Sequence, residues 1–147
     1  MSSRGQSKGC VATCIERKTR WYKGILISDC SAKSMEAAVK LLHVELPKGA
    51  IQTATTDRGK EFSCYKELEK DLNIQVYFAD AYSSWQRGSN ENGNGLQREF
   101  SPKKTNFDHV TIEELGQALN LINHRPRKYL GWKTAHETFQ EELLHLI

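Results

Sequence analysis

Asp57-Arg58-Gly59-Lys60-Glu61-Phe62 opens a segment that closes with Ser83-Ser84-Trp85-Gln86-Arg87-Gly88-Ser89-Asn90-Glu91-Asn92. Asp57 ends a short extended run over residues 50–56, and Glu91 follows a Gly into an expected helix. A strand end and a helix start can converge on one point, and two rigidly held carboxylates are the minimum set of protein ligands for Mg²⁺. An ordinary interpretation competes, because Asp is common before Gly turns and Glu is common in first helical turns.

Three motifs, in order along the chain, resemble the catalytic core of DDE-type transposases of the bacterial insertion sequence thirty family. Two are the motifs quoted above, and the third is Asn123-His124-Arg125-Pro126-Arg127-Lys128-Tyr129-Leu130-Gly131-Trp132-Lys133-Thr134. The resemblance covers about residues 5 to 140, and retroviral integrase cores are more distant relatives. It implies an α/β, ribonuclease H-like fold, in which helices flank a mixed sheet and three acids hold two metal ions.

The resemblance also implies the site residues. Asp57 and Glu91 match the second and third acids, so they are the expected catalytic residues and the expected ligands of Mg²⁺, with Mn²⁺ as a substitute. The first acid of the family lies on a central strand and has no match here. Asp29 follows the second hairpin strand, and we expect it to act at the turn before the next helix instead. We therefore expect a core shortened at its amino end, without its first, central strand, and with weak or absent metal binding.

Two functions of different classes follow from these motifs. The first is metal-dependent cleavage and transfer of DNA strands in transposition or integration, carried out by a polynucleotidyl transferase. The second is a catalytically inactive DNA-binding or regulatory module that associates with an intact transposase or with its own copies. Fold alone does not separate them. An in-frame strand with an Asp, encoded just upstream of Met1, would favour the enzyme.

Basic side chains occupy positions suited to DNA phosphates. Residues 122–133 hold four Lys or Arg and no acid, beside Tyr129 and Trp132. Such side chains can neutralise phosphates and stack on bases, although an ordinary solvated loop has the same composition. Helical spacing places further side chains near the face of Glu91. The expected DNA-binding residues are Arg87, Asn94, Arg98, Arg125, Arg127 and Lys128.

Length and composition set the remaining expectations. The 147 residues suit one domain, with a disordered start over residues 1–8 and a catalytic-core-like domain over residues 9–147. A net charge of +3 is too small to indicate a polyanionic partner by itself. We find no long apolar run and no leader pattern, so we expect no membrane span and a bacterial, reducing cytoplasm. In that setting we expect Cys10, Cys14, Cys30 and Cys64 to be buried thiols rather than disulfides or zinc ligands.

The apolar periodicity predicts the element order ββαβαβααα. The expected elements are a hairpin of residues 9–15 and 21–28, a helix from residue 31 to 46, a strand into residue 57, a helix over 65–72, a buried strand over 74–79, a helix over 89–100, and two helices that begin at the capping boxes of Thr111 and Thr134. The two single strands should pair in parallel. Without a central strand, the hairpin and the strand before Asp57 should keep unpaired inner edges.

Overall fold

The computed structural model describes residues 9–56, 62–79, 95–100, 107 and 109–146. Its elements are β1 (Cys10–Ile15), β2 (Tyr22–Ile27), α1 (Ala32–Glu45), β3 (Thr53–Thr56), α2 (Tyr65–Leu72), β4 (Gln75–Phe78), α4 (Ile112–Asn123), the short 3-10 helix η3 (Lys128–Leu130) and α5 (Ala135–Leu144). The expected helix over 89–100 is described only from residue 95, where residues 95–97 are helical. The expected disordered start lies outside the described residues.

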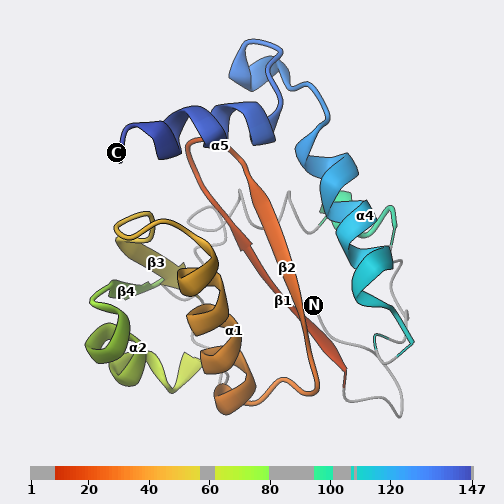
Figure 1. Cartoon of the computed structure of the whole chain (residues 1–147). Helices are drawn as coiled ribbons and strands as arrows, with labels where there is room; N and C mark the ends of the chain where they lie inside the picture. The colour runs from red at the N-terminus through yellow and green to blue at the C-terminus, as the bar shows by residue number, and fades with distance from the viewer. Residues whose placement is uncertain (1–8, 57–61, 80–94, 101–106, 108, 147) are drawn as a thin grey trace.

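The antiparallel hairpin of β1 and β2 is central to the molecule (Figure 1). Its register places Cys10 opposite Ile27. A carboxylate closes its turn, since Glu16 accepts hydrogen bonds from the backbone N–H groups of Lys18 and Thr19 at 3.0 and 2.6 Å. Arg20 completes the turn in the left-handed region, at φ 64°. A side chain therefore holds this turn, which has no glycine in it.

The hydrophobic core lies between the hairpin and α4. Its buried members are Val11, Tyr22, Phe107, Leu115, Leu119 and Ile122. Gly24 leaves room for the Val11 side chain in this core, because a Cβ there would lie 3.0 Å from Val11 Cγ1, whereas it would be in ordinary contact with Leu115 at 3.6 Å. Burial of this apolar cluster is what holds α4 against the hairpin.

A buried amide ties the end of α4 to β2. Asn123 Oδ1 accepts a hydrogen bond from the Tyr22 N–H at 2.9 Å, and Asn123 Nδ2 donates to the Tyr22 carbonyl at 2.8 Å. Tyr22 is completely buried and Asn123 is nearly so. The side chain thus supplies both partners that a further strand would have given this part of β2, where unpaired backbone groups would be costly.

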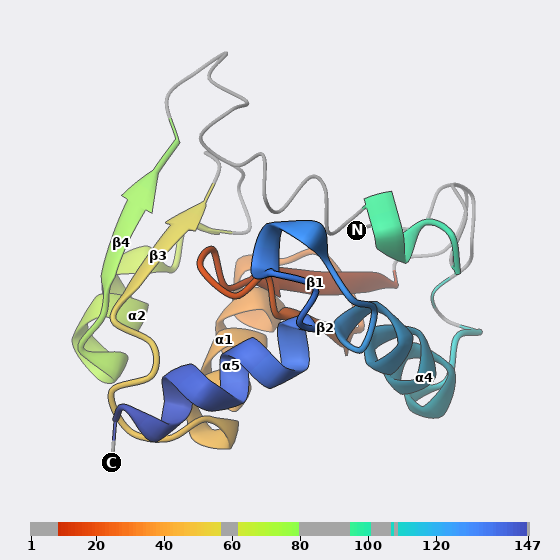
Figure 2. The same ribbon diagram turned by 90° about the horizontal axis from the view of Figure 1, so that it is seen from above.

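A second, parallel sheet consists of β3 and β4, with Thr53 opposite Gln75 and Thr56 opposite Phe78. It lies with α1 and α2 on the side of the hairpin away from α4 (Figures 1 and 2). The parallel pairing confirms the prediction. Across the described ranges no strand pairs with both sheets, so the expected single sheet is present as two two-stranded sheets.

The prediction of a buried strand over 74–79 was wrong in one respect. Residues of β4 alternate between exposed and half-buried positions. One face packs on α2, where Phe78 meets the Tyr65 ring edge-on at 5.1 Å between centroids, and the other face carries the exposed Tyr77. Only the flanking Ile74 and Ala79 are buried.

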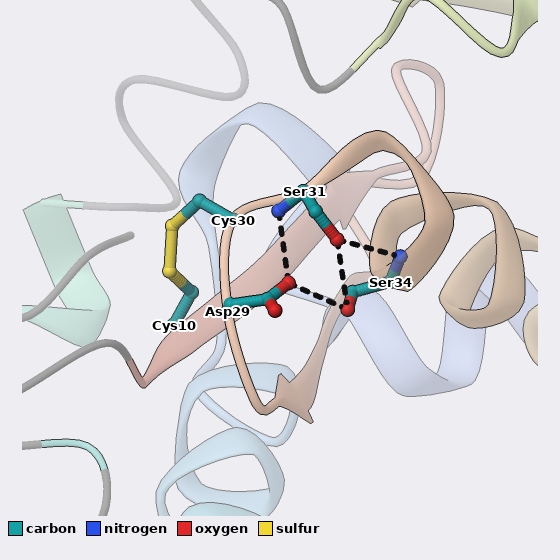
Figure 3. Close-up of a disulfide and its surroundings, with 5 residues drawn as sticks. All are labelled: Cys10, Asp29, Cys30, Ser31 and Ser34. Carbon is teal, nitrogen blue, oxygen red and sulfur yellow. Dashed lines mark hydrogen bonds between the residues drawn. A yellow bond between two sulfur atoms is a disulfide. The ribbon is translucent and has the colours of Figure 1, made fainter.

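Side chains cap the starts of three helices, and the capping box predicted at Thr111 is complete. Ser31 caps α1, and Asp29 Oδ1 accepts hydrogen bonds from Ser31 N at 3.0 Å and Ser34 Oγ at 2.7 Å (Figure 3). The expected role of Asp29 at this turn is therefore confirmed. The capping box of α4 is complete, with Thr111 as the N-cap residue. At α5, Thr134 accepts a hydrogen bond from the backbone of Glu137 at 3.1 Å.

The prediction of buried thiols was wrong for two cysteines, because Cys10 and Cys30 form a disulfide with their Cα atoms 6.0 Å apart (Figure 3). Cys10 begins β1 at the end of the hairpin where β2 finishes, and the bend after β2 brings Cys30 back beside it. Cys14 and Cys64 are free thiols. Burial raises the pKa of Cys14 to about 11, which keeps that thiol protonated and unreactive at neutral pH.

The disulfide closes a loop with a sequence separation of 20 residues. Because a crosslink of this length restricts the unfolded chain, reduction should lower the free energy of unfolding by about 3 kcal/mol. Urea denaturation with and without dithiothreitol measures the change. The double variant Cys10→Ser and Cys30→Ser is the control and should not respond to the reductant. An equal midpoint for the oxidised and reduced wild-type chain would contradict the prediction.

Asn123→Ala should lower the free energy of unfolding by roughly 3 kcal/mol, because both backbone groups of Tyr22 lose their partners in a buried position. The matched control is Asn120→Ala, an exposed position on the same helix, which should change stability by less than about 0.5 kcal/mol. Thermal and urea unfolding of the two variants give the comparison. Equal stabilities would show that the amide pair contributes little.

Candidate nucleic-acid interface

The sheet of β3 and β4 is the described part of the chain that directly precedes the first expected metal ligand, Asp57. Both strands end at the same edge, where Ala79 N donates a hydrogen bond to Thr56 O at 2.8 Å. Asp57 follows Thr56 directly in the chain. Asp57 and Glu91 themselves lie outside the described residues, as do Arg87 and Asn94. Within the described ranges, no group of three or more His, Cys, Asp or Glu side chains could hold a metal ion.

The basic third motif forms a closed loop between α4 and α5. Pro126 and Thr134 face each other in an isolated antiparallel bridge. Arg127 N donates to Lys133 O at 3.1 Å, and Trp132 N donates to Arg127 O at 2.9 Å. Gly131 and Trp132 both have left-handed backbone, at φ 64° and 68°. The motif is therefore held by its own backbone hydrogen bonds around η3.

Arg127 supports this loop as well as adding charge. Its guanidinium donates to the Ile122 carbonyl at 3.2 Å, which links the loop to the last turn of α4. Its Nε is buried, and no described atom pairs with it. Burial lowers the pKa of Arg127 from its ordinary value, and the positive charges of Arg125 and Arg20 lower it further. Three guanidinium groups therefore lie close together at this end of α4.

The other described residues that we expected to bind DNA differ in their exposure to solvent. Arg125 is exposed and forms an ion pair with Glu99 at 3.2 Å. Lys128 is exposed on η3. Arg98 is half-buried, with its guanidinium 5.9 Å from the centroid of the Phe107 ring. The Glu99 ion pair brings the segment that contains Arg98 alongside the third motif.

Sequence reasoning missed Arg20, which lies beside the basic third motif. The guanidinium of Arg20, on the hairpin turn, lies 4.7 Å from the centroid of the Tyr129 ring. Two contacts hold the hairpin turn at this end of the molecule, a stack of Trp21 on Phe139 with centroids 4.2 Å apart and an ion pair of Lys18 with Glu142 at 2.7 Å. Neither contact leaves a local pattern around Arg20, so only the tertiary structure reveals it.

The fold is similar to those of solved integrase structures. It superposes on the catalytic core domain of BIV integrase with a TM-score of 0.73 and 18% identity, over 97% of this chain and 90% of that one. A simian T-cell lymphotropic virus intasome, solved in complex with the PP2A regulatory subunit B56 gamma, matches with a TM-score of 0.71 and 16% identity, over 95% of this chain and 57% of that chain. The fold is therefore that of integrase catalytic cores, in the ribonuclease H-like class.

The sequence relatives are transposases. The transposase for insertion sequence element IS4351 of Bacteroides fragilis is 38% identical over 136 residues, which cover 91% of this chain and 41% of that protein. The InsI transposase for insertion sequence element IS30A of Escherichia coli (strain K12) is 35% identical over 136 residues, covering 92% of this chain and 36% of that protein. No family model matches. The chain is thus homologous to transposases of the insertion sequence thirty family, as its motifs predicted, and spans less than half the length of these curated relatives.

Proposed function

We propose that the chain is the catalytic-core part of a transposase that cuts and joins DNA strands with the help of divalent metal ions. The observation that carries this proposal is 38% identity over 136 residues to an insertion-sequence transposase, in a chain with the fold of an integrase core. Its DNA partners would be the ends of a mobile element and the target DNA. The chain would act with further copies or with a longer transposase, in the bacterial cytoplasm, where reductants would keep Cys10 and Cys30 as thiols.

Asp57 and Glu91 are the proposed catalytic residues and metal ligands. Carboxylate oxygens are the hard donors that Mg²⁺ and Mn²⁺ take. Asp57 follows the last residue of β3, and the carboxyl ends of parallel strands are where α/β folds commonly bind ligands. When bound, the metal would polarise a phosphodiester and lower the pKa of a bound water. The part of this chain is to hold the metal and to fix the phosphate with basic side chains.

The family pattern includes a third carboxylate, for which we propose a central strand. A strand that paired with both β1 and β3 would join the two sheets. The family has an acid on such a central strand, and two of its three acids match residues of this chain. A version of the chain with one Asp-bearing strand added ahead of Gly5 should therefore be more active than the 147-residue chain.

In the presence of Mg²⁺, the lengthened chain should cleave and join a DNA duplex that contains an end of the mobile element. The 147-residue chain should not. Asp57→Asn or Glu91→Gln in the lengthened chain should lower the rate at least about a hundredfold, because loss of a ligand misplaces the reacting groups. Asp29→Asn is the control, since Asp29 serves the turn before α1. Activity of the 147-residue chain that survives Asp57→Asn would overturn the assignment of Asp57 as a catalytic residue. A lengthened chain that folds and binds DNA without cutting it would favour a regulatory module.

DNA binding should be weak, independent of sequence and sensitive to salt. Arg125→Ala and Lys128→Ala should each reduce the slope of log affinity against log salt by about 0.9 on duplex DNA, because each removes one neutralised phosphate. Fluorescence anisotropy with a labelled duplex over a range of KCl concentrations measures the slope. Lys66→Ala, an exposed charge on α2, should leave it unchanged. Equal slopes for all variants would remove the third motif from the DNA interface.

A further inference from the structure

The hairpin turn and the third motif together form a surface at one end of the molecule, which we call the arginine–aromatic surface. It consists of Arg20 and Tyr129, which are in contact, and of Arg125, Arg127 and Trp132 from the same loop as Tyr129. The two segments that supply it are far apart in sequence, and the stack of Trp21 on Phe139 helps to bring them together. We propose that this surface binds DNA with unpaired bases, with phosphates on the arginines and bases on the two aromatic rings. The inference rests on the proposed action on DNA and adds the form of DNA that the surface prefers.

Among the described residues, the positive charge of this surface is only partly compensated. Arg125 pairs with Glu99 across 3.2 Å, but both side chains are about half exposed, and such a pair contributes little. Elsewhere in the described part, neither Arg20 nor Arg127 forms an ion pair. The carboxylates nearby serve other groups, since Glu142 pairs with Lys18 and Glu141 pairs with Lys133. Arg20 and Arg127, which have no carboxylate partner among the described side chains, would favour a nearby anion, and the planar forks of guanidinium groups match phosphate.

The aromatic rings are exposed at a cost to folding. The side chains of Tyr129 and Trp132 each remain 68% exposed. Trp132 also has a left-handed backbone, with φ 68°, which is uncommon for a bulky residue and energetically unfavourable. The hydrogen bond from Trp132 N to Arg127 O, at 2.9 Å, holds this conformation. A strained backbone that carries an exposed indole indicates a binding role for the ring rather than a role in packing.

The combination of groups selects the partner. Arg20 lies over Tyr129 at 4.7 Å from the ring centroid, so a base on the open face would complete a stack of base, phenol ring and guanidinium. Aromatic side chains stack on the bases of single strands largely without regard to sequence. In an intact duplex the base faces are covered by neighbouring bases. An acidic peptide would form ion pairs with the arginines, but its carboxylates would not stack on the Tyr129 and Trp132 rings. DNA with unpaired bases uses both.

The experiment compares three labelled DNAs of equal length by fluorescence anisotropy at one salt concentration. They are a single strand, a duplex with a short unpaired flap and a blunt duplex. The wild-type chain should bind the two DNAs with unpaired bases about tenfold more tightly than the blunt duplex. Tyr129→Ala and Trp132→Ala should each remove most of this preference, and should leave affinity for the blunt duplex within about twofold, because a stacked base contributes roughly a tenfold effect or more.

Further variants separate stacking from charge and from folding. Trp132→Phe should retain much of the preference. Trp132→Gly removes the ring and also relieves the left-handed backbone, so it should lose the preference without loss of thermal stability. Arg20→Ala should weaken binding to the single strand and reduce its salt slope by about 0.7. Ile112→Ala is the matched control, because Ile112 is 77% exposed on α4, away from this surface, and should change nothing.

The outcomes distinguish this inference from the proposed function. Equal affinity for all three DNAs, unchanged in the Trp132 variants, would overturn the inference and leave the proposed action on DNA intact. No binding to any DNA would count against both. If an acidic peptide of equal charge displaced the single strand as well as an unlabelled oligonucleotide does, the surface would recognise negative charge alone, and the assignment to unpaired bases would be wrong.

Discussion

The basic loop after α4 depends on the two hydrogen bonds between the Asn123 side-chain amide and the Tyr22 backbone. They fix the last residue of α4 against β2 in a fully buried position. The loop that carries the basic motif starts at the next residue, and Arg127 reaches back to the Ile122 carbonyl beside the same point. The loop is therefore anchored where it leaves α4, and the backbone hydrogen bonds of Arg127 with Lys133 and Trp132 close the rest of it.

On the other side of the hairpin, α1 holds α2 and the sheet of β3 and β4 in place. This helix contacts both β2 and α2, so it links the hairpin with the small parallel sheet that precedes Asp57. Its buried residues are Ala38 and Leu42, whereas the ion pairs of Lys40 with Glu36 and Asp71 are substantially exposed. Apolar packing therefore contributes more to this connection than the ion pairs do.

Local patterns predicted the elements well and their long-range contacts poorly. The hairpin, α1, α2 and the caps at Thr111 and Thr134 were predictable because periodicity and capping involve residues within a few positions of one another. The Cys10–Cys30 bond and the Arg20–Tyr129 contact were not, since both arise only when distant segments pack together. The fold class came from three motifs in order rather than from periodicity. The roles of Asp57 and Glu91 rest on those motifs alone.

The Cys10–Cys30 bond also determines how the folded chain would respond to tension. It joins the first residue of β1 to the bend that leads into α1, and so encloses the hairpin in a covalent ring. A pull applied at residue 9 would pass through the sulfur atoms to Cys30 and then to α1, without first separating β1 from β2. While the bond is intact the hairpin is outside the path of the force. Reduction would return it to that path, and the strands would then open one pair at a time.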